Sequence, residues 1–277
     1  MKTLTHKTLV ACILNIYLVF SVLAPQTGWT YILPLDFVVK KTVSHSNKKI
    51  VSIEQEVTFK SRTEPTEIKI SESWLIEGDK NLKVSANGLS NYKENIRYNS
   101  LINNKTKTQM IGKTKTSIQR SDDFYLHLAF ARSSERFLED LKSMGIPMQT
   151  RLSRADGYIT IAIGEASKDE KVFPQIWIDQ DQFLIRKIRM PSGTEITLSN
   201  YVKINPDTDQ EFWVAKKHVI KWGQEEVIVE VKNISTKTTA TLQSFYPKNL
   251  DTPSEMAFIS NQSGLTQIVE DFYSRFR

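Results

Sequence analysis

The sequence of 277 residues contains a single cysteine, Cys12, and this scarcity excludes several kinds of site. A disulfide needs two cysteines, and a Cys-ligated zinc site needs more than one. Cys12 lies within an apolar N-terminal run that we expect to be removed, so the mature chain would hold no thiol. The residues around Cys12 are similar in type to a lipoprotein signal, but most of the apolar run follows the cysteine. Lipidation is therefore the less favoured alternative.

Glycine and proline are also scarce, with 10 and 9 residues, which excludes collagen-like and proline-rich linker sequences. Hydrophobic residues make up 40% of the chain and charged residues 25%, as in ordinary globular proteins. No linker or shift in composition divides the chain. We therefore expect one domain, over residues 25–277, and a monomer.

Catalytic and metal-binding motifs are missing as well. Beyond the apolar N-terminal run the chain has three histidines, His45, His127 and His218, and none has the spacing of a metal site. A nucleophile elbow, a phosphate-binding glycine loop and a dinucleotide fingerprint are absent. Asp179 and Asp181 lie in a predicted turn without the further carboxylates of a calcium loop, which favours a solvated turn. We expect no catalytic residue, no metal and no cofactor, and an enzyme is the least favoured interpretation.

The N-terminus has the features of a secretory signal peptide. Lys2, His6 and Lys7 form a short basic region, and Leu9–Ala24 is almost continuously apolar. This run is shorter than the roughly 20 residues that a membrane-spanning helix needs, although a single-pass anchor is the alternative. We assign residues 1–24 to a signal peptide and leave its cleavage site unassigned. The protein is then expected in the periplasm or cell envelope.

The formal net charge of +6 falls to +4 once Lys2 and Lys7 are removed. Basic residues cluster between Asn103 and Arg120, where they could contact anionic lipid or nucleic acid. No aromatic residue is interleaved with them to stack on bases, and an exported protein rarely meets nucleic acid. A solvated polar hairpin is favoured, and no nucleic-acid partner is expected.

The periodicity of the mature chain begins helical and then becomes that of strands. Apolar positions at helical spacing predict a short amphipathic helix over Leu35–Val43, after Pro34. Alternation of apolar and polar residues predicts antiparallel strands at 50–60, 66–78, 81–87, 95–103, 108–113 and 116–120.

A helix interrupts the middle of the chain. Ser133 is a suitable N-cap before residues 134–144, and Gly145 marks the end of this helix. The preceding segment, 122–132, is ambiguous between helix and strand.

The second half of the chain returns to hairpins. The Asp156–Gly157 dipeptide predicts a tight turn between two β-rich runs. Further strands are predicted at 175–179, 183–190, 194–204, 212–222 and 225–235. A C-terminal helix over 262–277 would carry an apolar stripe of Leu265, Ile268, Val269, Phe272 and Phe276, and such a stripe needs an apolar partner.

These elements predict a mainly β domain of the α+β class, with one antiparallel sheet long enough to curl and a few helices packed on it. One apolar face of such a sheet needs a cover of helices, another sheet or a ligand. We therefore consider a ligand cavity on that face as well as a fully packed core.

The first two strands predict their own register, because facing residues of an antiparallel pair have a constant sum of residue numbers. A sum of 127 places apolar residues opposite one another throughout and sets Gln55 opposite Glu72. This pair would either reach water at a rim or orient a ligand head group. The candidate cavity residues are Val51, Ile53, Gln55, Val57, Phe59, Ile68, Ile70, Glu72, Trp74 and Ile76.

Three stretches carry a family resemblance: ESWLIEGDKNLKVS at 72–85, QIWIDQDQFLIRKIRM at 175–190 and GTEITLSNYVKI at 193–204. Behind a signal peptide and a short helix, this order resembles the periplasmic lipoprotein-carrier superfamily (LolA/LolB-like) over roughly Leu35–Asp251. The resemblance implies an incomplete antiparallel β-barrel with helices across its mouth and a hydrophobic cavity for acyl chains. No functional residue of the family is matched position by position, and the basic insert near 91–120 and the C-terminal helix depart from a minimal carrier.

The sequence therefore favours a non-enzymatic envelope protein that binds an acyl chain, lipid or lipoprotein in a β-walled hydrophobic cavity, a class that includes outer-membrane lipoprotein carriers. The alternative is an envelope interaction or sensor domain with a filled core that binds a protein partner.

Overall fold

The computed structural model describes residues 32–46, 49–60, 67–93, 95–111, 113–166, 172–204, 212–250, 252–256 and 263–277. Met1–Ile32 and Leu33–Arg277 are separate units, and the description below concerns the second. The expected signal peptide at 1–24 lies outside the described residues and stays a prediction. None of the described helices is long and apolar enough to cross a bilayer.

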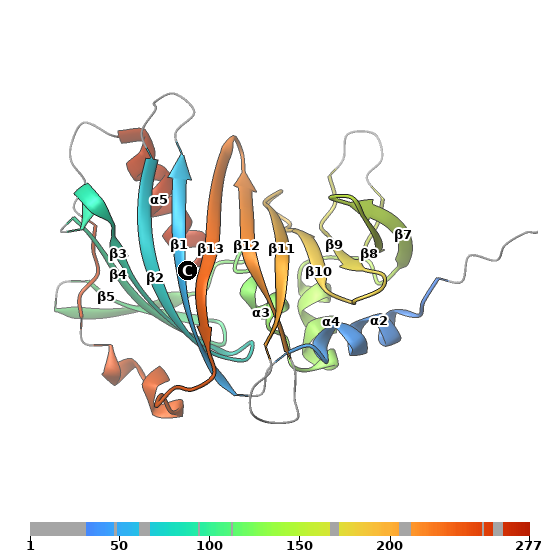
Figure 1. Ribbon diagram of the computed structural model, residues 1–277, viewed down its shortest axis with the longest axis horizontal. Helices are drawn as coiled ribbons and strands as arrows, with labels where there is room; N and C mark the ends of the chain where they lie inside the picture. The colour runs from blue at the N-terminus through green and yellow to red at the C-terminus, as the bar shows by residue number, and fades with distance from the viewer. Residues whose placement is uncertain are drawn as a thin grey trace, which may run out of the picture. The chain divides into compact units, whose positions relative to one another are not determined.

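The alternating segments form one large antiparallel sheet that is open and curved (Figure 1). Its strands are β1 (Ile50–Lys60), β2 (Glu67–Glu77), β3 (Asn81–Gly88), β4 (Ile96–Asn103), β5 (Thr106–Ile111), β6 (Thr114–Gln119), β7 (Thr150–Ala155), β8 (Tyr158–Ile163), β9 (Gln175–Asp179), β10 (Ile185–Arg189), β11 (Glu195–Ile204), β12 (Phe212–Trp222), β13 (Glu225–Ser235) and the short β14 (Glu255–Met256). The expectation of a mainly β fold with a curved antiparallel sheet is confirmed.

The strand order is β6-β5-β4-β3-β2-β1-β13-β12-β11-β10-β9-β8-β7, with β14 paired to β4. Two runs of consecutive hairpins, β1–β6 and β7–β13, therefore meet where β1 pairs with β13. The predicted basic insert near 91–120 contains β4, β5 and β6, and the last two extend the sheet beyond β4.

The predicted register of the first hairpin is confirmed. Val57 faces Ile70 and Ile53 faces Trp74, so apolar side chains meet across the pair. Gln55 faces Glu72 in the same register. The alternation places these side chains on one buried face of the sheet, because successive strand residues point to opposite sides.

Helices lie on this inner face. The α-helices are α2 (Leu35–Val43), α3 (Leu126–Ala129), α4 (Ser134–Ser143) and α5 (Ser263–Phe276), and short 3₁₀ turns occur at Ser90–Tyr92, Leu242–Phe245 and Pro247–Asn249. In Figure 1, α3, α4 and α5 all lie behind the sheet. The predicted cap is present, since Ser133 Oγ accepts a hydrogen bond from the backbone N–H of Arg136. The ambiguous segment at 122–132 contains the single-turn helix α3.

The β7–β8 connection is the tight turn predicted from Asp156 and Gly157. Their φ angles are 49° and 85°, which places both central residues in the left-handed region. A two-residue hairpin of this kind matches the twist of the flanking strands, and asparagine, aspartate and glycine tolerate its backbone best.

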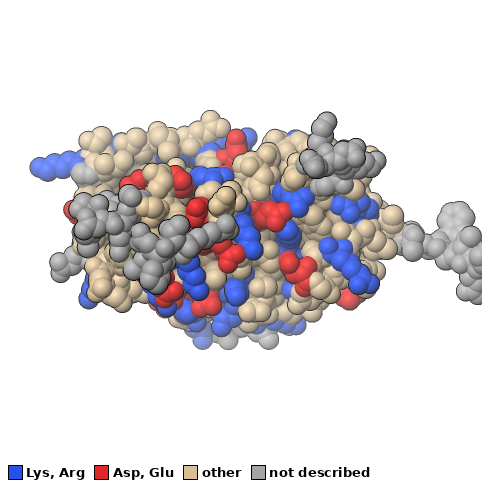
Figure 2. All heavy atoms as spheres, turned by 90° about the horizontal axis from the view of Figure 1, so that it is seen from above, with Lys and Arg blue, Asp and Glu red and all other residues tan. Residues whose placement is uncertain are grey.

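Charged side chains are interspersed on the surface. Figure 2 shows the molecule from above in the orientation of Figure 1. On this face basic and acidic residues are interspersed, without a large patch of one sign. On this face the modest positive charge of the chain is therefore spread out, which gives no focused attraction for a polyanion.

Candidate functional site

The ten residues predicted to line a cavity come together on the inner face of β1 and β2. All ten are buried, with at most 4% of any of them exposed. A wall residue that faced an open cavity wide enough for a ligand would keep accessible surface. The wall is therefore covered by packed side chains in this structure.

The cover over one half of the wall is α5. The rings of Phe272 and Tyr273 pack on Phe59 of β1, with centroids 5.2 and 6.4 Å away. Phe276 packs on Trp222 of β12 at 5.2 Å. The predicted stripe of this helix is confirmed in its buried residues Leu265, Val269, Phe272 and Phe276, while Ile268 is partly buried.

Arg277, the residue that follows α5, contacts Glu72, which is one of the two polar residues of the wall. Its Nε donates to both carboxylate oxygens of Glu72, at 3.2 and 3.1 Å, and its guanidinium lies 4.6 Å from the ring centroid of Trp74. Gln55 Nε2 and Trp74 Nε1 also donate to Glu72 Oε2. Glu72 and Arg277 side chains are both 0% exposed. The residue after α5 thus supplies the positive charge that stabilises a buried glutamate.

Burial shifts the pKa values of this cluster. Desolvation alone would lower the pKa of Arg277, but the adjacent Glu72 carboxylate outweighs it and raises that pKa. Desolvation also raises the pKa values of the Tyr98 and Tyr273 hydroxyls, so both stay neutral at ordinary pH. Tyr98 donates to the Arg277 carbonyl oxygen at 3.1 Å and accepts from Gln109. Arg277 and Glu72 are thus paired with each other beside neutral hydroxyl groups.

Lys107 of β5 holds the end of the same helix. Its Nζ donates to the carbonyl oxygens of Tyr273 and Ser274, at 2.6 and 3.2 Å, which are groups left without partners at a helix C-terminus. Burial, helped by the charge of Arg277, lowers the pKa of Lys107 to about 7. The basic segment was expected to be a solvated hairpin, and this expectation holds for β6, which is exposed throughout, but is wrong for Lys107. Its buried partner comes from a helix more than 150 residues away, so no local pattern pointed to it.

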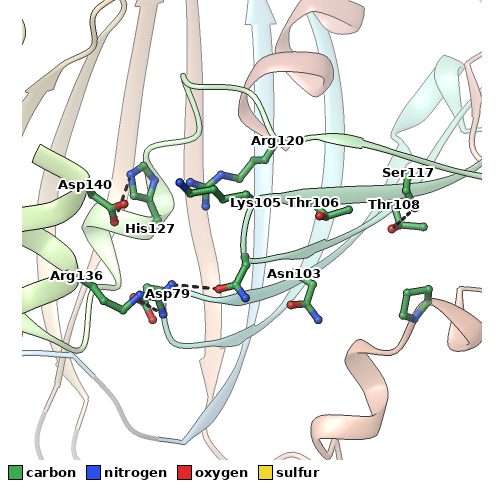
Figure 3. Close-up of a pocket in the computed structure, with 12 residues that line it drawn as sticks. Asp79, Asn103, Lys105, Thr106, Thr108, Ser117, Arg120, His127, Arg136 and Asp140 are labelled. Atoms are coloured by element: carbon green, nitrogen blue, oxygen red, sulfur yellow. Dashed lines mark hydrogen bonds and ion pairs between the residues drawn. The ribbon is translucent and has the colours of Figure 1, made fainter. Parts of the chain in front are cut away.

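A second feature is a polar hollow of about 680 Å³ beside the β4–β5 turn (Figure 3). It lies between this turn, the β2–β3 connection, β6 with Arg120 after it, α3, α4 and the 3₁₀ turn at Pro247. The lining residues are Asp79, Asn103, Asn104, Lys105, Thr106, Thr108, Ser117, Arg120, His127, Arg136, Asp140 and Pro247. Sequence reasoning did not predict this hollow, because its residues come from segments that are far apart along the chain.

Comparison with known proteins gives a fold relationship. No protein-family model matches the chain, and no curated protein matches it in sequence. A LolA superfamily protein from Nitrosomonas europaea matches with a TM-score of 0.53 at 11% identity, over 79% of this chain and all of the other. A domain named for outer membrane lipoprotein sorting, from Vibrio parahaemolyticus, matches with a TM-score of 0.51 at 12% identity, over 78% of this chain and 97% of the other. The chain has the LolA-superfamily fold.

Two of the histidines in this LolA-like fold, His127 of α3 and His218 of β12, are buried. His218 Nε2 donates to the Ala215 carbonyl at 3.2 Å, so Nδ1 accepts from the Tyr125 hydroxyl at 2.7 Å. Burial lowers the pKa values of His127 and His218 to about 3, so both are neutral at physiological pH. A neutral, desolvated imidazole with this pKa is a poor general base at neutral pH.

Asp179, the first carboxylate of the turn considered for calcium, has a different partner. Its Oδ2 accepts from Arg186 at 2.7 and 3.0 Å, and its Oδ1 accepts the backbone N–H groups of Asp181 and Gln182. These bonds fix the β9–β10 turn of the LolA-like sheet. Among the described residues, no group of three or more potential ligands could hold a metal ion.

Proposed function

We propose that this chain is a non-enzymatic cell-envelope protein that binds an acyl chain, lipid or lipoprotein on the inner face of its LolA-like sheet. The observation that carries the proposal is the wall on β1 and β2, which is apolar except for Gln55 and Glu72 and is covered by helices. A helix can leave such a face as a unit without breaking the hydrogen bonds between the strands. The similarity to a domain named for lipoprotein sorting supports the same class of ligand.

Ligand binding at this wall requires α5 to move, because its aromatic side chains fill the space above Phe59 and Trp222. The polar part of the wall is not fully paired beneath the helix. Within the described part of the chain, Gln55 Oε1 is buried without a hydrogen-bond partner. An unpaired buried group of this kind costs about 1–3 kcal/mol, which lowers the free energy needed to displace α5.

An acyl chain is a suitable replacement for the helix. Burial of each CH₂ contributes about 0.8 kcal/mol, so a chain of about twelve carbons gains about 10 kcal/mol before the costs of ordering. This gain is of the size needed to compete with the aromatic side chains of α5. Binding would then be coupled to helix release and reversible.

The test is native mass spectrometry of the protein purified from its own cells, combined with titration by a fluorescent fatty acid. We expect co-purified lipid or saturable binding in the micromolar range. Titration is repeated with a chain shortened to residue 256, in which α5 cannot compete, and tighter binding is expected there. Absence of lipid and of fatty-acid binding from both forms would overturn the proposal.

The second candidate is an interaction or sensor domain that binds a protein partner. The filled inner face favours it, because all ten wall residues are already buried by the chain itself. An isolated protein that binds no lipid with or without α5, yet recovers one stoichiometric protein partner from the cell envelope, would favour this candidate.

A further inference from the structure

The polar hollow contains two cationic side chains, Lys105 and Arg120, that lie next to each other in space. The backbone N–H of Arg120 donates to the Lys105 carbonyl oxygen at 2.7 Å, so the two residues are neighbours where β5 begins and β6 ends. Figure 3 shows their side chains lying side by side and extending toward His127 and Asp140. The Arg120 guanidinium lies 4.8 Å from the ring centroid of Phe124, which fixes its plane.

The other charges around this hollow are mostly engaged. Arg136 pairs with Asp79 at 3.2 Å and donates to Asn104 at 3.1 Å. Asp140 lies 3.7 Å from His127, whose pKa of about 3 leaves it uncharged. Asp140 is therefore the lining carboxylate that faces both Lys105 and Arg120.

Neither of these two cations has a carboxylate in salt-bridge contact within the described residues. Asp122 lines the adjoining hollow of about 420 Å³, but it is exposed to solvent. Burial lowers the pKa of Arg120, and Asp140 only partly opposes that shift. Two adjacent cations with one shared carboxylate leave a local excess of positive charge, which an anion would relieve.

The hollow leads to the inner face of the sheet. Asp79 and His127 also border a narrow, mainly apolar seam. Its apolar walls are Ile76, Leu82, Ile102, Phe124, Leu126 and Phe130, and Gly78, Lys80 and Asn81 complete the lining. Ile76 belongs to the apolar wall described above. The seam holds about 10 Å³ at present, so side chains there must part to admit a chain. It reaches the wall from the α3 side, whereas α5 covers the half near Phe59.

We propose that the polar hollow binds the phosphate of an amphiphile through Lys105 and Arg120, while its acyl chain enters the apolar seam toward Ile76. This inference rests on the proposed function and adds the chemistry of the head group. A planar guanidinium and an ammonium suit a phosphate, and the Thr106 hydroxyl lines the same hollow, whereas the hydroxyls of Thr108 and Ser117 are bonded to each other at 2.9 Å. The volume of about 680 Å³ accommodates a phospholipid head group.

The experiment compares two ligands of equal chain length, lysophosphatidylglycerol and neutral monoacylglycerol, on the full mature chain. The variant is Lys105→Gln with Arg120→Gln, and the matched control is Lys93→Gln, which removes an exposed lysine at another part of the surface. We expect wild type and control to bind the phospholipid at least tenfold more tightly than monoacylglycerol. The double variant should bind both ligands equally, with monoacylglycerol affinity and melting temperature unchanged.

Competition with inorganic phosphate distinguishes a lipid phosphate from free phosphate as the ligand of the hollow. Competition by millimolar phosphate against lysophosphatidylglycerol, but not against monoacylglycerol, supports a lipid head group in the hollow. Phosphate binding by wild type with no preference for the phospholipid would assign the hollow to free phosphate and overturn the inference. Equal binding of both ligands by wild type and double variant would also overturn it, while leaving acyl binding intact. If neither ligand binds to the mature chain, the inference fails, and the proposed function is decided separately by the fatty-acid titration of the chain shortened to residue 256.

Discussion

Arg277 and Glu72 form an ion pair with no exposed surface on either side chain, and this pair joins the C-terminal segment to the second strand of the sheet. Two charges lose their hydration in such a site, so their attraction is largely offset. The pair therefore contributes little net free energy of folding. We infer that its physical effect is specificity, because α5 fits this face best where a carboxylate meets the guanidinium of Arg277.

Loss of one partner should be far more damaging than loss of both. Arg277→Leu or Glu72→Leu leaves an unpaired buried charge, and we expect each to lower the free energy of unfolding by about 3–5 kcal/mol. The double variant should recover much of this loss. Urea denaturation of the four proteins measures the coupling. Lys69→Met is the control, since it breaks exposed pairs with Glu56 and Glu67 that solvent screens, and it should lower the free energy of unfolding far less than either buried substitution. Additive effects of the two buried substitutions would contradict the prediction.

Removal of α5 should expose the apolar wall. Deletion of residues 262–277 takes away the aromatic cover over Phe59 and Trp222. We expect a lower melting temperature together with increased binding of a hydrophobic dye. Differential scanning fluorimetry and dye titration on the same sample measure both. If neither property changes, α5 is not part of the folded unit in solution and acts as a free segment.

Stability should depend on pH through Lys107. Its pKa is about 7 in the folded protein and near 10.5 when unfolded, so the unfolded chain binds the extra proton between these values. The free energy of unfolding should then rise as pH increases from about 7 to 10. Lys107→Met should remove this rise. Chemical denaturation of both proteins at pH 6, 8 and 10 tests the sign, and a wild-type curve parallel to that of the variant would exclude it.

Export should shorten the chain. The basic start followed by the apolar run Leu9–Ala24 predicts that a signal peptidase removes about 20–30 residues. Intact-mass analysis of the protein from its own cell envelope measures this directly. A mass that includes Met1, in a membrane fraction, would instead indicate an N-terminal anchor.

Local sequence patterns were sufficient to predict most of the sheet, but they did not predict its contacts with the C-terminal segment. Alternation located the hairpins, and the matching of apolar partners gave the β1–β2 register, including Gln55 opposite Glu72. Those relations link residues close in sequence. The contact of Arg277 with Glu72 spans 205 positions, and Lys107 meets Tyr273 across 166. Neither sequence segment alone distinguishes Arg277 or Lys107 from the many basic side chains that are exposed to solvent.

The junction of β1 with β13 has a consequence for how the chain reaches its native state. Every other neighbour in the main strand order follows its partner directly along the chain, so the two runs of hairpins can form from local contacts. At the junction, Phe59 must find Val227, and Gln55 must find Val231. Closing so large a loop costs conformational entropy before any contact is gained, and it slows folding. We infer that the rate-limiting step is the meeting of two preformed half-sheets, with exposed strand edges until they join.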